Sequence, residues 1–324
     1  GHGPSPQVAG GRLIIEGADI LRAVDVYTGR LLWERELEGV GEYYNITGHF
    51  PGAGEIGSNY VSLPDAVYVV YGTKILELNV ETGKTKKQFS LPNDPNFGWL
   101  SVQGDYLVTT IAPIAVKLGN IEKKQKAFDA ADKVAKDAEA KANKIGTDKN
   151  KKKEVKAAAL KTAAAKRKLA DAAKKALAQA QPEAVDSRFA SGSRQLAVFN
   201  RHTAKLLWTR DAQYNFRHNN IALGAGSVFV IDSLTEARLK AMRRRGLKPK
   251  GKPVLYALDI NNGNLRWQTD ENVFGTFLNY STEHDLLLQA GSAYRDRAKD
   301  DIGQGMVAFR GRDGKILWAN KDLS

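Results

Sequence analysis

The sequence predicts an all-β protein built from repeated four-stranded antiparallel units and interrupted by one helical hairpin. Two observations carry this prediction. A frame of Asp or Asn, a Thr-Gly turn and a Trp recurs along the 324-residue chain, and one stretch rich in Ala and Lys separates two of its copies. Once that stretch is set aside, the copies lie about 50–60 residues apart. Strand-rich units with this period are typical of a β-propeller, in which each unit is one blade.

Five copies of the frame share one spacing: the Asp-like position always lies eight residues before the Trp-like position. The copies are "LRAVDVYTGRLLW" ending at Trp33, "ILELNVETGKTKK" ending at Lys87, "QLAVFNRHTAKLLW" ending at Trp208, "LYALDINNGNLRW" ending at Trp267 and "MVAFRGRDGKILW" ending at Trp318. Four of the five tryptophans occupy this one position. We expect Trp33, Trp208, Trp267 and Trp318 to be buried between neighbouring blades, where a large ring fills the space between sheets.

Each copy has the pattern of a β-hairpin. In the first copy, residues 21–27 alternate apolar and polar side chains, Thr28-Gly29 supplies the turn and residues 31–36 return. The side chain of Asp25 is placed to accept hydrogen bonds from turn amides. Two more strand candidates precede each hairpin, such as residues 59–65 and 66–72 in the second unit. The sequence therefore predicts five blades with strands A to D.

The run Ala-x-Asp-x-x-Thr-Gly-x-x-x-Trp, from Ala23 to Trp33 and nearly so from Ala257 to Trp267, resembles the repeat of PQQ-like β-propellers. That family includes quinoprotein alcohol dehydrogenases and the propeller lipoprotein of the outer-membrane assembly machine. The resemblance covers nearly all of the chain outside residues 113–192. It implies a periplasmic or cell-envelope location and a ring of seven or eight blades, so we expect the five blades to be part of a larger propeller.

The inserted stretch divides the chain into residues 1–112 (blades one, two and the start of three), 113–192 (a basic helical hairpin) and 193–324 (the remaining blades). Residues 117–181 hold 19 Lys and Arg against 8 Asp and Glu, which accounts for most of the net charge of +13. Mostly apolar residues recur every seven positions, as Ile121, Phe128, Ala135, Ala142 on one arm and Val155, Thr162, Leu169, Ala176 on the other. This predicts two antiparallel helices with an Ala-rich seam. A solvated spacer is the favoured interpretation, and a contact device for a partner is the alternative.

Composition excludes several classes of function. The chain has no Cys, so it has no disulfide framework and no thiolate metal site. No apolar run reaches membrane-spanning length. Acidic residues interspersed along the basic helices argue against a specific nucleic-acid site. No phosphate-binding loop, zinc signature or nucleophile motif is present.

Candidate site residues follow from the strand order. The connections from strand B to C and from D to A leave the blades on one face, and all of the long connections fall there. Long loops commonly carry function. The innermost strands also begin on this face. The candidate ligand- and partner-binding residues of this loop-rich face and of the axial mouth are His2, Tyr43, Tyr44, Asn45, His49, Glu55, Asn59, Trp99, Arg217, His218 and Asn220. An ordinary water-filled mouth is the favoured interpretation of these entry residues.

Two functional interpretations stay open. The first is a non-catalytic binding scaffold of a larger bacterial protein, which presents the loop-rich face to a protein partner. The second, implied by the resemblance, is a quinoprotein-type oxidoreductase domain that binds the small molecule PQQ and calcium at the axis. For that function Trp99 would stack on the flat ring, Asn59 and Glu55 would supply oxygen ligands, and Arg217 would pair with a carboxylate. The first is favoured, and no catalytic residue or metal ligand is assigned.

Overall fold

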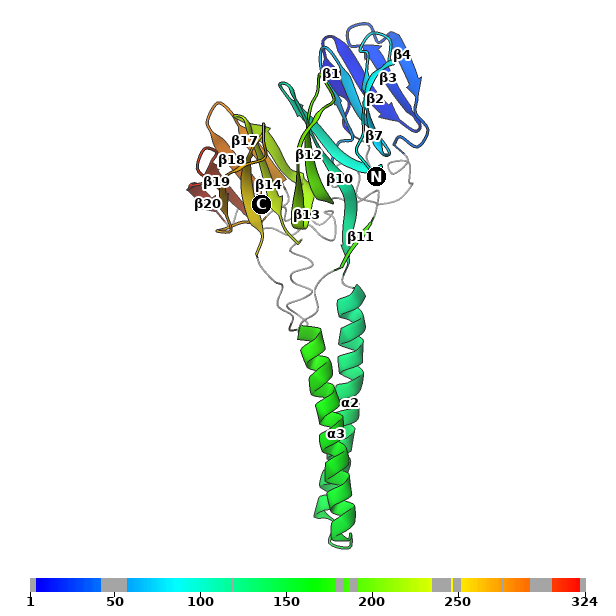
Figure 1. Ribbon diagram of the computed structural model, residues 1–324, viewed down its shortest axis with the longest axis vertical. Coiled ribbons are helices and arrows are strands. Elements are labelled where there is room, and N and C mark those ends of the chain that lie inside the picture. Colours follow the sequence, from blue (N-terminus) through cyan, green and yellow to red (C-terminus); the bar gives the residue numbers. More distant parts are fainter. Residues whose placement is uncertain are drawn as a thin grey trace. The chain divides into compact units, whose positions relative to one another are not determined.

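The computed structural model describes residues 4–41, 57–117, 119–178, 183–186, 192–234, 246, 252–274, 277–291 and 305–320. The chain forms two compact units. One comprises residues 1–115, 184–237 and 252–324, and the other comprises residues 116–183 and 238–251. The first unit contains the β-sheets and the second contains two long helices (Figure 1). Neither helix is long and apolar enough to cross a membrane.

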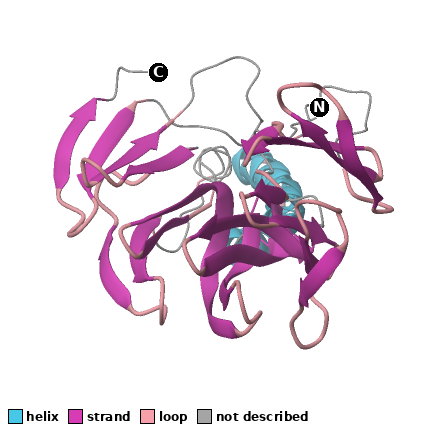
Figure 2. Ribbon diagram, turned by 90° about the horizontal axis from the view of Figure 1, so that it is seen from above, coloured by secondary structure: helices cyan, strands magenta, loops and turns pink. Residues whose placement is uncertain are grey.

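Five propeller blades of antiparallel strands follow one another along the first unit (Figure 2). Blade one is β1 (Gln7–Ala9), β2 (Arg12–Gly17), β3 (Ile20–Asp25) and β4 (Leu31–Glu36). Blade two is β5 (Tyr60–Ser62), β6 (Val67–Tyr71), β7 (Lys74–Leu78) and β8 (Thr85–Phe89). Blade five is β17 (Phe277–Ser281), β18 (Leu286–Ala290), β19 (Met306–Arg310) and β20 (Ile316–Asn320). The predicted strand order within these blades is confirmed.

Blades three and four share a strand, which the sequence did not predict. Blade three contains β9 (Phe97–Gln103), β10 (Tyr106–Lys117), β12 (Gly192–Asn200) and the first part of β13 (Leu206–Gly224). Blade four contains the rest of β13, β14 (Ser227–Asp232), β15 (Val254–Asp259) and β16 (Leu265–Thr269). A short strand, β11 (Glu183–Asp186), is added beside β10. Because β13 runs through without a break, the two blades form one eight-stranded sheet.

In blades one to four the Asp or Asn residue of the frame accepts hydrogen bonds from turn amides, as the sequence predicts. Asp25 Oδ1 accepts hydrogen bonds from the backbone N–H of Thr28 at 2.8 Å and from its hydroxyl at 2.9 Å. These bonds lower the pKa of Asp25. Asn79 and Asn200 make the same set of bonds in blades two and three. Blade five has Arg310 at this position, and there Asp313 accepts a hydrogen bond from the backbone N–H of Lys315 instead.

The Trp-like residue joins each blade to the next one. The indole nitrogens of Trp33, Trp208 and Trp267 donate to the carbonyl oxygens of Val80, Ile260 and Gly311, at 2.8, 2.8 and 2.7 Å. Each acceptor directly follows the Asp-like residue of the next blade. Each ring also lies against the turn glycine of that blade. A Cβ added at Gly83, Gly263 or Gly314 would come within 2.6, 2.7 or 2.6 Å of the ring.

Burial of the Trp-like residues differs from the expectation in one blade. Trp33 and Trp208 are 7% and 9% exposed, and Trp267 is half-buried. The expectation is wrong for Trp318, which is 42% exposed. The reason is that no described segment supplies the next turn for its ring. Blade two has Lys87 in place of Trp, and its ammonium donates to the carbonyl of Arg201 at 3.4 Å, the equivalent acceptor in blade three.

Apolar clusters hold the blades together, and the described residues form one for each pair of successive blades. Ile14, Leu21 and Trp33 pack with Val67 and Leu78 between blades one and two. The equivalent clusters lie between blades two and three, three and four, and four and five. The core of this unit therefore repeats along the chain, and each blade depends on its neighbours for burial.

The second unit contains α2 (Gly119–Thr147) and α3 (Lys153–Ala178), which pack against each other. Ala135 and Ala142 are buried as predicted. The predicted seam of the second arm is wrong: Val155 and Leu169 are exposed, and Ala163, Ala170 and Leu177 are buried instead. The sequence around residues 157–165 is so rich in Ala that several helix faces offer an equally good seam.

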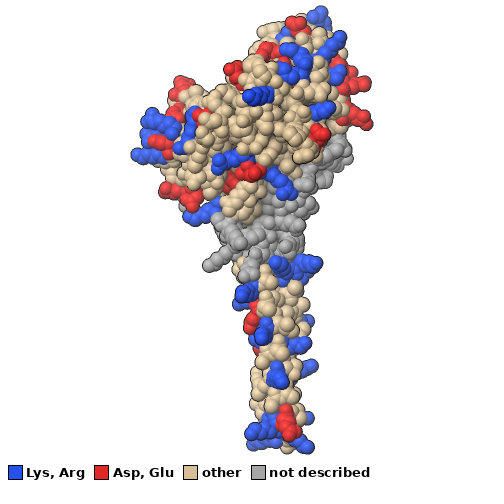
Figure 3. Space-filling model, viewed as in Figure 1, with Lys and Arg blue, Asp and Glu red and all other residues tan. Residues whose placement is uncertain are grey.

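Ion pairs between α3 and α2 accompany the observed seam. Arg167 binds Glu139 through two hydrogen bonds of 2.8 and 2.9 Å and Asp132 through one of 2.6 Å. Basic side chains are distributed along both helices on the surface that Figure 3 shows.

Candidate functional site

The entry to the innermost strand of blade four lies in a buried polar cluster. His218 on β13 is 1% exposed, and its Nε2 lies 2.8 Å from Ser193 Oγ and 3.1 Å from Thr110 Oγ1. Both hydroxyls are also fully buried. We call His218, Ser193 and Thr110 the imidazole–hydroxyl cluster. Strand β10 and the hairpin strands β12 and β13 bring these residues together.

Two glycines make room for this cluster. A Cβ on Gly98 would come within 2.6 Å of Thr110 Oγ1 and 3.1 Å of the His218 ring. A Cβ on Gly57 would lie 2.5 Å from the Trp99 ring and 3.3 Å from His218 Cβ. Segments from blades two, three and four therefore converge here at distances that exclude larger side chains.

Hydrogen bonds to backbone groups fix Trp99 and the middle of β13. The Trp99 N–H donates to Thr110 Oγ1 at 3.0 Å, and its carbonyl accepts from Thr109 Oγ1 at 2.8 Å. Asp232, at the end of β14, accepts hydrogen bonds from the backbone amides of Gln213 and Tyr214. Burial raises the pKa of Asp232, and these amide bonds oppose the rise. The bonds hold the stretch just before Arg217 and His218 in place.

A second polar pair joins blades one and two. The Asn59 amide donates to Glu16 Oε2 at 2.7 Å. Burial raises the pKa of Glu16 to about 7, although the Asn59 hydrogen bond lowers it. Within the described part of the chain, Glu16 Oε1 and Asn59 Oδ1 are buried without a hydrogen-bond partner. Glu16 is therefore a carboxyl group that titrates near neutral pH.

The structure brings some of the predicted site residues together and separates others. Trp99 and His218 meet beside Gly57, whereas the Asn59 side chain is directed to Glu16. Arg217, His218 and Asn220 are all buried, so they do not line a water-filled mouth. His2, Tyr43, Tyr44, Asn45, His49 and Glu55 lie outside the described residues.

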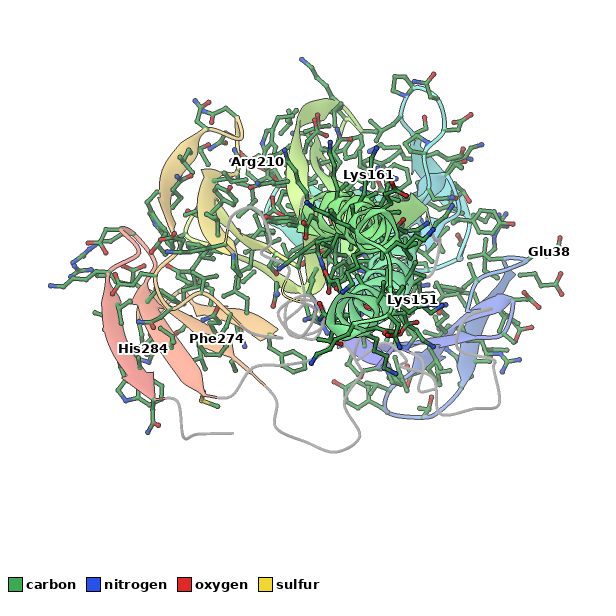
Figure 4. The ribbon with its side chains drawn as sticks, turned by 90° about the horizontal axis from the view of Figure 1, so that it is seen from below. Glu38, Lys151, Lys161, Arg210, Phe274 and His284 are labelled. Carbon is green, nitrogen blue, oxygen red and sulfur yellow. The ribbon has the colours of Figure 1, made fainter. Side chains whose placement is uncertain are left out.

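The two other histidines among the described residues, His202 and His284, occupy exposed turns. His202 lies in the turn before β13, with its Nε2 2.9 Å from Asp105 Oδ1. His284 lies in the turn between β17 and β18 (Figure 4). Neither takes part in the imidazole–hydroxyl cluster.

Sequence reasoning missed Glu16, Thr110 and Ser193. None of them belongs to a motif, and each lies far along the chain from its partner. One usable signal was present for two of them: Thr110 and Ser193 flank the insertion, at the end of strand B and the start of strand C. Strand pairing must place those ends side by side, as the pairing of Pro113 with Ser193 shows.

The chemistry available to the cluster is limited. A Ser–His distance of 2.8 Å is within the range of a nucleophile and its base. However, a substrate must reach the nucleophile, and both side chains are fully enclosed by protein. The arrangement satisfies buried polar groups in the way that a structural network does.

The described residues also fit PQQ and calcium poorly. His218 Nε2 and the Asn59 amide already have partners within the protein. Within the described part of the chain, no group of three or more His, Asp or Glu side chains is placed to hold a metal ion.

A comparison with known protein families supports the assignment of the repeat to PQQ-like propellers. Residues 174–322 match the family model PQQ_2, described as outer membrane protein assembly factor BamB. The match spans just under half of the chain and confirms the resemblance to PQQ-like propellers. No curated protein sequence matches the chain.

The solved structures that resemble this chain include three at low sequence identity. BamB from Moraxella catarrhalis has a TM-score of 0.46 and 15% identity, covering 100% of this chain and 64% of that one. Sqt1 from Saccharomyces cerevisiae has a TM-score of 0.47 and 9% identity, covering 96% and 58%. A chain of the Mitotic Checkpoint Complex has a TM-score of 0.38 and 6% identity, covering 79% and 46%. This chain spans less than two thirds of each.

Proposed function

We propose that the blades form a rigid, non-catalytic binding scaffold of a cell-envelope protein, which takes a protein partner on its loop-rich face. One observation carries the proposal: the polar groups at the entries of the inner strands bind one another. His218 is held by Ser193 and Thr110, and Asn59 is held by Glu16. Groups that are enclosed and paired in this way give rigidity, whereas a catalytic set must remain open to substrate.

The match to the BamB family model supports the choice of partner class and location. That model describes an assembly factor for outer membrane proteins. A scaffold of this kind binds by its surface, and the long B-to-C and D-to-A connections leave one face of the blades. Binding residues are frequently carried by loops on a rigid scaffold.

A cross-linking experiment tests which face binds. A photoreactive residue replaces Glu271, an exposed residue in the connection from β16 to β17 on the loop-rich face. The matched control replaces Asn262, an exposed residue in the turn from β15 to β16 on the opposite face. Each variant is mixed with envelope proteins of the cells that produce this chain. The variant at position 271 should cross-link one defined protein, and the variant at position 262 should not. Equal labelling from both faces would contradict the proposal.

A titration with PQQ and calcium separates the two functional classes. The scaffold function predicts no saturable quinone absorbance change, with or without calcium. Saturable binding that Trp99→Ala removes would favour the oxidoreductase interpretation instead.

A further inference from the structure

Helix α3 has two rows of mostly apolar residues, and only one of them is buried. The buried row is Ala163, Ala170 and Leu177. The other row repeats at the same interval of seven residues, one position earlier in the sequence, so it lies about 100° around the helix. Together with the alanines three residues further on, it forms what we call the second seam: Val155, Ala158, Thr162, Ala165, Leu169, Ala172 and Ala176. This is the row that the sequence pattern alone selects as the contact with α2.

All seven residues of the second seam are exposed. The two largest apolar side chains, Val155 and Leu169, are 44% and 61% exposed. Thr162 is the one polar member, and its hydroxyl donates to the carbonyl oxygen of Ala158 at 3.0 Å, within the helix. The second seam is therefore an apolar surface that extends over residues 155–176, which corresponds to about 33 Å of helix.

Lysines border the second seam on both sides. Lys161, Lys168 and Lys175 form a row on one flank, and Lys166 lies on the other. All four are exposed, and no ion pair within the described part of the chain involves them. Glu154 is the one acidic residue in the two flanking rows. The second seam thus has an apolar centre and basic edges.

This combination favours one class of occupant. In paired helices the apolar heptad rows interlock, and the flanking charges of one helix face opposite charges on the other. A helix whose apolar row is flanked by Asp and Glu is therefore complementary to the second seam. The same seam of a second copy would place Lys against Lys in either a parallel or an antiparallel arrangement. A polyanion would neutralise the lysines but leave Val155 and Leu169 uncovered.

We propose that the second seam of α3 binds an amphipathic helix of a partner protein, with an apolar heptad row flanked by acidic residues. The helices would then be a contact device rather than a solvated spacer. The surface belongs to the helical unit and not to the blades, so the inference does not rest on the function proposed above. Its test also leaves the loop-rich face of the blades unchanged.

A peptide of three heptads provides the probe. It has Leu at both seam positions and Glu at both flanking positions of each heptad, and a fluorescent label reports its binding to the full chain by anisotropy. The unmodified chain should bind this peptide saturably, with an affinity that falls as the salt concentration rises. A peptide with Lys in place of every Glu should not bind. Absence of saturable binding by the Glu peptide would overturn the proposal.

Two exposed leucines of α3 test whether the second seam is the contact. Leu169→Glu places a carboxylate in the seam, where the bound helix would bury it, and should weaken peptide binding by at least about tenfold. Leu160→Glu is the matched control, because Leu160 is 58% exposed but lies outside the second seam. It should leave binding unchanged, and circular dichroism should show the same helix content in both variants. Equal weakening by both variants, or by neither, would overturn the proposal.

A pair of charge variants tests the basic edge. The double variant Lys161→Gln, Lys168→Gln should weaken peptide binding several-fold and reduce its salt dependence. The control is Lys151→Gln, Lys152→Gln in the turn between α2 and α3, which removes the same charge away from the second seam. It should bind as the unmodified chain does. Binding that depends on the lysines but not on Leu169 would show a general polyanion surface and overturn the assignment to a helix.

Discussion

Glu77 and Lys87 face each other across β7 and β8, with 3.2 Å between Glu77 Oε2 and Lys87 Nζ. In the other blades this cross-strand pair is Ala or Val opposite Trp: Ala23 with Trp33, Val198 with Trp208, Ala257 with Trp267 and Ala308 with Trp318. The following blade differs as well, because its turn has Ala204 where the others have Gly. These three positions thus differ together from their counterparts in the other blades. The Lys87 ammonium donates to the carbonyl of Arg201, where the other blades use an indole N–H.

The contact between blades two and three should therefore be convertible to the Trp form only when Glu77, Lys87 and Ala204 are all replaced together. Lys87→Trp alone should lower the free energy of unfolding by about 1–3 kcal/mol, since the ring meets the Cβ of Ala204 and Glu77 loses a partner. The triple variant Glu77→Ala, Lys87→Trp, Ala204→Gly should recover most of that loss in urea denaturation. Ala204→Gly alone is the control and should change the free energy of unfolding by less than about 1 kcal/mol, because the added chain entropy is offset by relief of the strained φ of 57° at Ala204. A triple variant no more stable than the single one would refute this account of the contact.

Trp208 should matter far more to stability than Trp318. Trp208→Ala removes a ring buried between blades three and four and should cost about 3–5 kcal/mol. Trp318→Ala removes a ring that is largely exposed, so its cost in dilute protein should stay below about 1 kcal/mol. Chemical denaturation of both variants provides the comparison. Equal losses would mean that Trp318 is buried in solution.

Stability should fall with rising pH because of Glu16. The folded-state pKa of Glu16 is raised from 4.5 to about 7, so the folded protein holds this proton more tightly than the unfolded chain. The favourable contribution of this proton to the free energy of unfolding is complete below the pKa of the unfolded state and is lost as the pH rises from 4.5 toward 7. Glu16→Gln should flatten the stability profile across that window in denaturation experiments at several pH values. Parallel profiles for the two proteins would show that Glu16 does not titrate there.

The helices should be dispensable for folding of the blades. The buried residues of α2 and α3, such as Ala142 and Ala170, pack in a seam between the two helices. Replacing residues 117–184 with a short Gly/Ser loop should leave the melting temperature of the blades nearly unchanged. The same deletion should abolish most salt-dependent binding to a polyanion such as heparin, because it removes most of the net positive charge. A collapse of folding would mean that the blades need the helices.

Local patterns in the sequence were sufficient to predict the blades. Asp25, Thr28 and Gly29 act within one turn, so their spacing alone identifies the hairpin. The register of α3 could not be predicted in the same way, because the long Ala stretch allows several faces, and contacts such as Arg167 with Glu139 join residues that are far apart in the sequence. The imidazole–hydroxyl cluster could not be predicted from the sequence either. Its members come from three strands, and hydroxyl side chains have no periodic pattern that marks them as buried partners of a histidine.

The unbroken strand β13 has a mechanical consequence. A turn or loop between two blades can act as a hinge, but a continuous hydrogen-bonded strand cannot bend freely. Blades three and four should therefore open as one cooperative unit, with their amide hydrogens exchanging at similar rates. The helices are inserted between β10 and β12, and β12 pairs directly with β13. Any pulling force on the helices would enter the blades at this point and be shared by blades three and four at once, because they form one sheet.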